Sequence, residues 1–155
     1  MTLTILQPDT EDQFDDFRNL VREFFGWAMA ALVDDDTPID MNAGHFATLD
    51  KELAELPVKF GPPDGCILIA YVDNQPAGCV GFFRRNEETM EVKRMYVRPE
   101  FRGQKIGEYL MAELLSRATD MSYRRYILSS HKSMASAHAI YCKAGFSEVA
   151  WTKTD

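Results

Sequence analysis

TMEVKRMYVRPEFRGQKIG, residues 89–107, is the most informative stretch of the chain. Apolar side chains fall at Met90 and Val92 and then at Met95 and Val97, so the two-residue period of a strand slips by one. One extra residue is how a β-bulge looks in sequence, and a bulge leaves backbone N–H and C=O groups for a ligand. A regular strand that turns a Met or Val to solvent would give the same letters, so both interpretations stay open.

The following segment, Val97–Gly107, leads from this strand into a helix through a loop with two glycines and three Lys or Arg side chains. Apolar residues at helical spacing predict the helix over Ile106–Thr119, with an exposed Glu113–Arg117 pair. A helix N-terminus offers unsatisfied N–H groups, and glycines allow close backbone approach, so the segment predicts a phosphate cradle. An ordinary strand–helix connection is the alternative. Neither GxxxxGK[ST] nor GxGxxG occurs, which excludes the Walker and Rossmann motifs.

Outward from this centre, periodicity and turn residues predict alternating strands and helices. Strands are expected at 2–7, 66–72, 77–83, 89–97, 126–129 and 148–152, and helices at 10–32, 46–56, 106–119 and 133–144. The last three strands are separated by helices, which implies a partly parallel sheet. The sequence therefore predicts one α/β domain over residues 1–155, with a mixed sheet flanked by about four helices.

Composition and charge argue against two classes of function, nucleic-acid binding and membrane spanning. The 155 residues carry a net charge of −7, which disfavours nucleic-acid binding, and no run approaches the roughly 20 apolar residues of a membrane helix. Residues 1–83 hold 4 Lys or Arg against 15 Asp or Glu, whereas residues 84–155 hold 13 against 9. Three scattered cysteines and an acidic N-terminus predict reduced thiols and a cytoplasmic protein. No metal site is expected.

Two segments of the second half of the chain match motifs of one known family. MYVRPEFRGQKIGEYLMAELLSRA resembles the acyl-CoA-binding motif V-x-P-x-x-R-G-x-G-x-G of the GNAT superfamily of N-acyltransferases. Downstream, AHAIYCKAGF, residues 137–146, is similar to the second family motif A-x-x-L-Y-x-K-x-G-F. The resemblance covers residues 77–150. It implies a centrally splayed sheet, with residues 1–65 supplying the acceptor-side helices and residues 66–155 forming the acetyl-CoA-binding core.

The resemblance also implies where acetyl-CoA, the co-substrate, would lie. The pyrophosphate would rest on the amides of residues 102–107, and the pantetheine arm would pair like an extra strand with residues 95–97. The residues expected to bind the cofactor are Met95, Tyr96, Val97, Arg102, Gly103, Gln104, Lys105, Ile106, Gly107, Met134 and Lys143.

Two catalytic side chains follow from the same comparison. Tyr141 matches the family tyrosine that protonates the leaving thiolate, although it could also be a core aromatic. Glu91 stands where the family often places the carboxylate that deprotonates the amine; a solvated glutamate paired with Lys93 is the alternative. His131 and His138 are weaker candidates, and Cys142 has no expected role.

The expected reaction is acetyl transfer from acetyl-CoA to a primary amine of a small molecule, by direct attack in a ternary complex. The chain departs from the family at Lys105, usually glycine, and at Met134, usually asparagine. These departures keep a non-catalytic acyl-CoA-binding module open as an alternative, alongside a protein or peptide N-acetyltransferase. The acidic first half predicts cationic amine acceptors. A homodimer is left open, and neither nucleic acid nor membrane is an expected partner.

Overall fold

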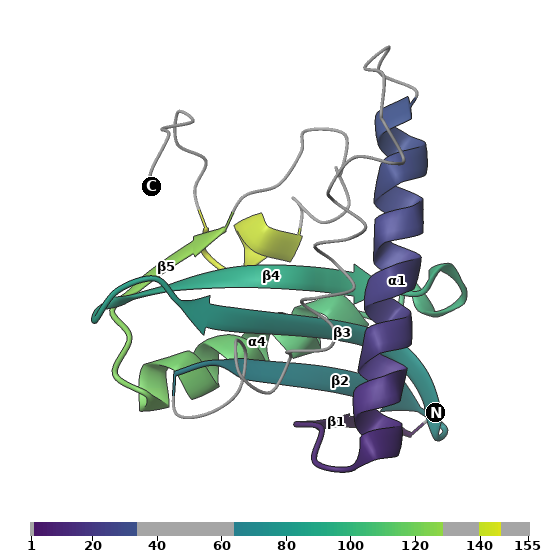
Figure 1. Ribbon diagram of the computed structural model, residues 1–155, viewed down its shortest axis with the longest axis horizontal. Helices are drawn as coiled ribbons and strands as arrows, with labels where there is room; N and C mark the ends of the chain where they lie inside the picture. Colours follow the sequence, from purple (N-terminus) through teal and green to yellow (C-terminus); the bar gives the residue numbers. More distant parts are fainter. Residues whose placement is uncertain (1, 34–63, 129–139, 147–155) are drawn as a thin grey trace.

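The chain builds a five-stranded sheet in the order β1-β2-β3-β4-β5. The computed structural model describes residues 2–33, 64–128 and 140–146. The strands are β1 (Leu3–Leu6), β2 (Cys66–Val72), β3 (Gln75–Arg84), β4 (Thr89–Val97) and β5 (Arg125–Leu128). All neighbours run antiparallel except β4 and β5, which are parallel. The predicted mixed sheet is confirmed (Figure 1).

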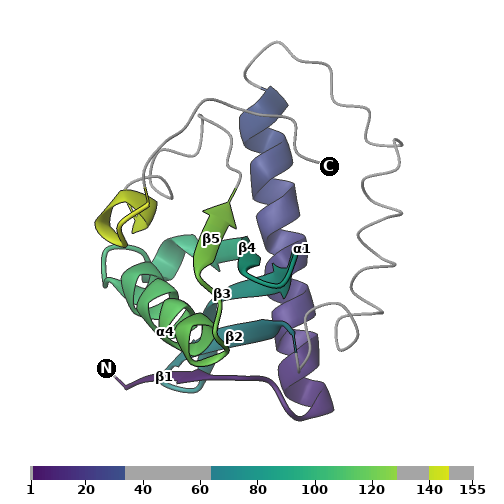
Figure 2. The same cartoon turned by 90° about the vertical axis from the view of Figure 1, so that its left-hand side faces the viewer.

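Two long helices enclose the sheet. They are α1 (Glu11–Val33) and α4 (Ile106–Asp120), and they cover opposite faces (Figure 2). The 3₁₀ turn η1 (Pro99–Phe101) precedes α4, and a helical turn spans 140–143. The predicted helix over 46–56, the strand over 148–152 and residues 133–139 of the last predicted helix lie outside the described residues. No helix in the described ranges is long and apolar enough to cross a membrane.

A capping box starts α1. The hydroxyl of Thr10 accepts a hydrogen bond from the backbone N–H of Gln13 at 3.2 Å, and the Gln13 side chain accepts one from the N–H of Thr10 at 3.3 Å. This reciprocal pair satisfies donors that a helix N-terminus otherwise leaves without partners. The start of the helix therefore lies where the sequence predicts it.

The sheet is buried on both faces, which explains the continuous apolar runs in β2 and β3. Side chains alternate along β2, so that Ile67 and Ile69 pack under Phe17 of α1, while Leu68 and Ala70 face α4. All four β2 residues are at most 3% exposed. Burial of this kind is the main stabilising contribution to such a fold, at about 25 cal/mol per Å² of apolar surface.

The predicted bulge is present in β4. Cys79 of β3 lies opposite Tyr96 and Gly81 lies opposite Lys93, so a single residue between them faces both Arg94 and Met95. Arg94 takes the left-handed conformation, with φ +63°. The pairing of β4 with β5 ends at Val92, five residues before β4 itself ends. Within the described residues, the edge of β4 beyond the bulge is thus open on the β5 side.

Candidate functional site

The loop between β4 and α4 presents backbone amides beside positive charge. Residues 102–105 are exposed, whereas Ile106 and Gly107 are buried. Gly103 has φ +85° and Lys105 has φ +64°, so the chain turns twice through the left-handed region before α4 begins. No described side chain caps the helix at Lys105. The first amides of α4 therefore point outward without intrahelical partners, as an anion site requires.

Two arginines fix this loop to the sheet. The Nε of Arg102 donates to the carbonyl of Val97 at 3.0 Å, and its guanidinium lies over the Tyr96 ring, 5.9 Å from the centroid. Arg98 donates from Nε to Glu23 of α1 at 3.0 Å and from Nη1 to the carbonyl of Pro76 at 3.0 Å. The Glu23 carboxylate raises the pKa of Arg98 above its ordinary value, so this cation is fixed in place. The sequence motifs did not single out Arg98, because its partners come from α1 and β3.

The two sequence motifs meet at Gly107. A Cβ at this position would lie 2.7 Å from Cδ1 of Ile140, 3.0 Å from Cε of Met95 and 3.6 Å from Cγ2 of Val97. A larger residue at this position would therefore push the ends of the Ile140 and Met95 side chains aside. The N-terminus of α4, the strand beyond the bulge and the turn that carries Tyr141 therefore converge on one point, although they are far apart in sequence.

Tyr141 follows Ile140 in this turn and packs against the core on the α4 face. Its ring meets that of Phe146 edge-on, with centroids 6.3 Å apart. Burial raises the pKa of Tyr141 to about 12. The phenol therefore keeps its proton throughout the neutral range, as a proton donor must.

Glu91 lies on the other face of the sheet, where α1 packs. Its side chain is 9% exposed and is held between two cations: Nε of Arg85 at 3.4 Å and Nζ of Lys93 at 3.5 Å. The pair with Lys93 is the one suggested by the sequence, and Arg85 is an addition. Sequence could not indicate Arg85, because the β3–β4 turn brings it to Glu91.

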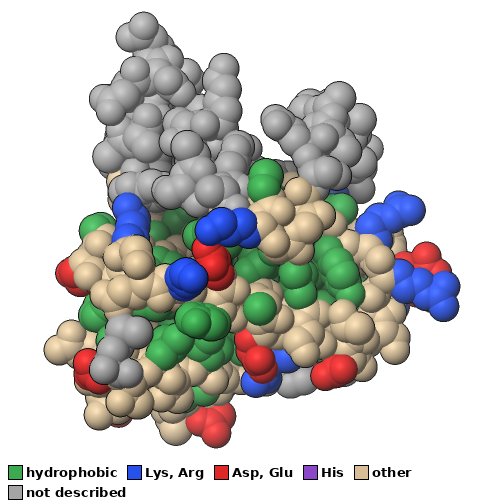
Figure 3. All heavy atoms as spheres, turned by 180° about the vertical axis from the view of Figure 1, so that it is seen from behind, with side chains coloured by type: hydrophobic (Ala, Val, Ile, Leu, Met, Phe, Trp, Pro, Cys, Tyr) green, Lys and Arg blue, Asp and Glu red, His purple; other side chains and the backbone are tan. Residues whose placement is uncertain are grey.

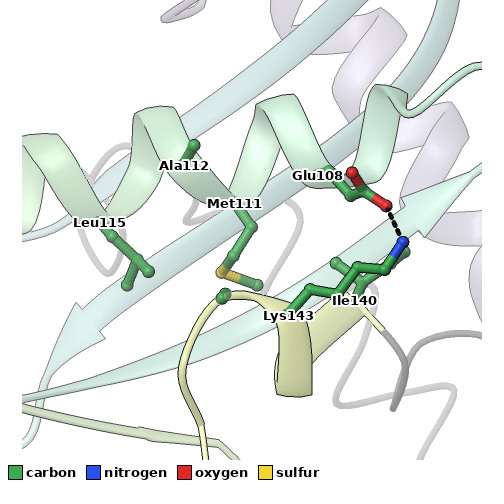
Figure 4. A pocket seen from close by; sticks show the side chains of 7 residues that line it. Glu108, Met111, Ala112, Leu115, Ile140 and Lys143 are labelled. Carbon is green, nitrogen blue, oxygen red and sulfur yellow. Dashed lines mark hydrogen bonds and ion pairs between the residues drawn. The ribbon is translucent and has the colours of Figure 1, made fainter.

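A groove of about 350 Å³ runs between α4 and the 140–144 turn. Figure 3 shows the face on which α4 lies, where apolar side chains form a hollow bordered by charged ones. Figure 4 shows the ion pair across its mouth, in which Nζ of Lys143 lies 2.9 Å from Glu108. The groove was not predicted. It is lined by Glu108, Met111, Ala112, Leu115, Ile140, Lys143 and Ala144.

Some predicted residues are not placed by the structure. Met134, His131 and His138 lie outside the described residues. Among the residues that are described, no group of three His, Cys, Asp or Glu could hold a metal ion.

Comparison with known proteins identifies the fold and the family. Residues 14–146 match the Acetyltransferase (GNAT) family. An uncharacterized N-acetyltransferase of Schizosaccharomyces pombe is 32% identical over 134 residues, covering 85% of this chain and 75% of that protein. Human N-acetylaspartate synthetase is 31% identical over 86 residues, covering 55% of this chain and only 28% of that protein.

Solved structures give the same answer for the fold. The PaiA N-acetyltransferase of Thermoplasma acidophilum, solved in complex with coenzyme A, superposes with a TM-score of 0.74 at 21% identity, covering 95% of this chain and 91% of that one. The arrangement of the sheet and its helices is therefore a known fold. The chain belongs to the GNAT family, and it is an acetyl-CoA-dependent N-acetyltransferase.

Proposed function

We propose that the protein transfers the acetyl group of acetyl-CoA to a primary amine of a small molecule, by direct attack while both substrates are bound. The observation that carries this proposal is the convergence at Gly107 of the bulged strand, the α4 amides and the turn that holds Tyr141. A binding site for one ligand that is built from both motifs is what a two-substrate acetyl transfer needs.

The residues present fit coenzyme A. The amides of residues 103–107 and the cations Arg102 and Lys105 suit a pyrophosphate. The N–H of Arg102 itself donates to the carbonyl of Pro99 at 3.2 Å. The edge of β4 at residues 95–97 has no neighbouring strand among the described residues, so an extended chain with amide groups could pair there as an added strand. The carbonyl of Val97 would exchange its donor Arg102 for this chain. Lys143 would reach a phosphate by exchanging its partner Glu108 for the ligand.

The proposed chemistry assigns one task to each group. Acetyl-CoA supplies an activated acetyl thioester. A backbone N–H at the bulge would donate to the carbonyl oxygen, on which negative charge develops as the amine attacks. Glu91 would take the proton of the ammonium, directly or through water. As the new C–N bond forms and the C–S bond breaks, the hydroxyl of Tyr141 would give its proton to the leaving thiolate.

A small-molecule acceptor is favoured by one relative. The name N-acetylaspartate synthetase describes a protein that acetylates the amine of an amino acid, and 86 residues of the human protein align with this chain. That alignment covers a minor part of the relative, so the acceptor of this chain is part of the proposal.

The test is release of free CoA thiol from acetyl-CoA with a panel of amines, for the wild type and for Tyr141→Phe. The substitution keeps the ring and its contact with Phe146. We expect acetyl-CoA binding to persist while kcat falls about 10- to 1000-fold, the range for a lost general acid. Because burial raises the pKa of Tyr141 to about 12, the wild-type rate should show no decline from loss of this proton between pH 7 and about pH 10.

The matched control is Tyr109→Phe, since Tyr109 is a 52% exposed tyrosine on α4. Its kcat should equal that of the wild type. A Tyr141→Phe variant with kcat within about twofold of the wild type would show that another group protonates the thiolate. Acetyl-CoA binding without thiol release for every amine would instead favour the non-catalytic binding module.

A further inference from the structure

The carboxylate of Glu91 contacts two cationic side chains. Glu91, Lys93 and Arg85 form an ion cluster, the Glu91 triad, in which one carboxylate lies within 3.5 Å of two positive groups. Lys93 is fixed further by the ring of Phe83, whose centroid lies 5.6 Å from its Nζ. The triad therefore carries a net positive charge.

Strand register places more positive charge on the same face. Phe83 lies opposite Glu91 and belongs to the cluster that packs under α1, which assigns the triad to the α1 face. In the parallel ladder with β5, Thr89 pairs with Arg125 and Glu91 pairs with Ile127, so Arg125 projects to the same side as Glu91. Arg125 is exposed.

Most acids of α1 have partners other than these cations. Four acids of α1 have partners of their own along the helix and at the far end of the sheet. Glu11 and Asp15 pair with Arg18, Asp16 accepts from the Tyr71 hydroxyl, and Glu23 pairs with Arg98. Among the residues that the structure describes, the acidic excess that predicts cationic acceptors is thus not found next to Glu91.

We propose that the Glu91 triad selects an acceptor that carries a carboxylate beside its amine, and that Lys93 binds this carboxylate. This inference rests on the proposed function. The ammonium of a zwitterion would pair with Glu91 and its carboxylate with Lys93, so each charge of the ligand meets an opposite one. A purely cationic amine would bring its charge against Lys93 and Arg85, and like charges at such a distance repel.

The exposures of the side chains agree with these tasks. Lys93 is 37% exposed and Arg85 is 28% exposed, so a ligand can reach both from solvent. Glu91, at 9%, lies deeper. An acceptor would meet the cations first with its carboxylate, and its amine would follow towards the carboxylate of Glu91.

The experiment compares amino acids with the amines left when their α-carboxylate is removed. Suitable pairs are leucine and isoamylamine, phenylalanine and phenethylamine, lysine and cadaverine, and aspartate and β-alanine. For the wild type, kcat/KM from CoA-thiol release should favour the α-amino acid in the preferred pair by about 10- to 100-fold. This ratio corresponds to the free energy of one or two charge-assisted hydrogen bonds.

The variant is Lys93→Met, which keeps an unbranched side chain against Phe83 and removes the charge. It should raise KM for the amino acid and bring the ratio within the pair to about threefold or less. Any general effect on Glu91 acts on both members of a pair and cancels in the ratio. The control is Arg124→Met, which removes an 81% exposed cation in the turn before β5 and should leave the ratio unchanged.

Three results decide the matter. Decarboxylated amines that equal or exceed their amino acids in the wild type would overturn the proposal while leaving the acetyltransferase function intact. A Lys93→Met variant that lowers kcat/KM equally for both members of a pair would also overturn it, because Lys93 would then not bind the carboxylate. Absence of thiol release with every pair would contradict the proposed function itself, and this inference with it.

Discussion

Lys105 occupies a backbone conformation that suits glycine. Its φ of +64° and ψ of 18° place it in the left-handed region, where a Cβ crowds the following carbonyl. Glycine is the residue that the resemblance to the GNAT motif leads one to expect at this position. The chain thus accepts local strain and gains a long cation beside the amides that start α4.

Replacing Lys105 should separate these two effects. Lys105→Gly should raise the free energy of unfolding by roughly 0.5–1 kcal/mol, because relief of strain exceeds the extra chain entropy of glycine. The same variant should weaken acetyl-CoA binding, since a cation is lost near the pyrophosphate. Urea denaturation and calorimetric titration measure the two quantities.

Lys105→Ala is the matched control, because it removes the cation and keeps the strained φ. It should weaken acetyl-CoA binding as much as Lys105→Gly does, with no gain in stability. Equal unfolding free energies for the two variants would mean that position 105 stores no strain.

At the scale of the element, the bulge in β4 is supported from the neighbouring strand. The thiol of Cys79 donates to the carbonyl of Arg94 at 3.3 Å. Burial raises the pKa of Cys79 well above its ordinary value, so the thiol keeps the proton that it donates. In a trans peptide the next N–H points opposite to this carbonyl, so the bond also fixes the direction of the Met95 N–H.

Removing this bond should disturb the bulge. Cys79→Ala leaves the Arg94 carbonyl without that donor and should cost about 1–3 kcal/mol of stability and several-fold in kcat. Cys79→Ser keeps a donor and should retain kcat. The control is Cys66→Ala on β2, a buried cysteine two strands away from β4 whose thiol donates to the adjacent carbonyl of Ile67 at 3.9 Å. Equal kcat losses in Cys79→Ala and Cys66→Ala would contradict this role for Cys79.

Elements were predictable where their signal is local. The slip of period in β4, the capping box at Thr10 and the Glu113–Arg117 pair, now 3.0 Å apart, are each encoded within a few residues. Contacts across the fold were not predictable. Ile140 on Gly107 and Lys143 on Glu108 depend on how α4 and the 140–144 turn pack, and no spacing within either segment specifies that.

At the scale of the whole molecule, β4 connects two different sites. Within the described residues, its backbone beyond the bulge has no neighbouring strand on the β5 side. The start of α4 and Tyr141 lie on one face of the sheet, whereas Glu91 and Lys93 project to the other face, under α1. Two substrates that approach from opposite faces would meet at the bulge. This arrangement explains why one strand contains most of the residues that carry the proposed chemistry.

The proposed position of acetyl-CoA leads to a prediction for the glycines. Gly103→Val forces a branched residue into φ +85° in an exposed loop, and Gly107→Val drives a side chain into Ile140. Both should lose the cofactor, the first with little effect on the core. Gly26→Val is the control, because a Cβ at Gly26 in α1 would meet no atom within 4 Å.

The most direct test is calorimetric titration of acetyl-CoA into the wild type, Gly103→Val, Gly107→Val and Gly26→Val, each first shown by circular dichroism to be folded. We expect the wild type and Gly26→Val to bind with equal Kd, and folded Gly103→Val and Gly107→Val to bind with a Kd at least about tenfold weaker. Wild-type affinity in both folded variants would contradict this expectation, because acetyl-CoA would then bind away from the start of α4.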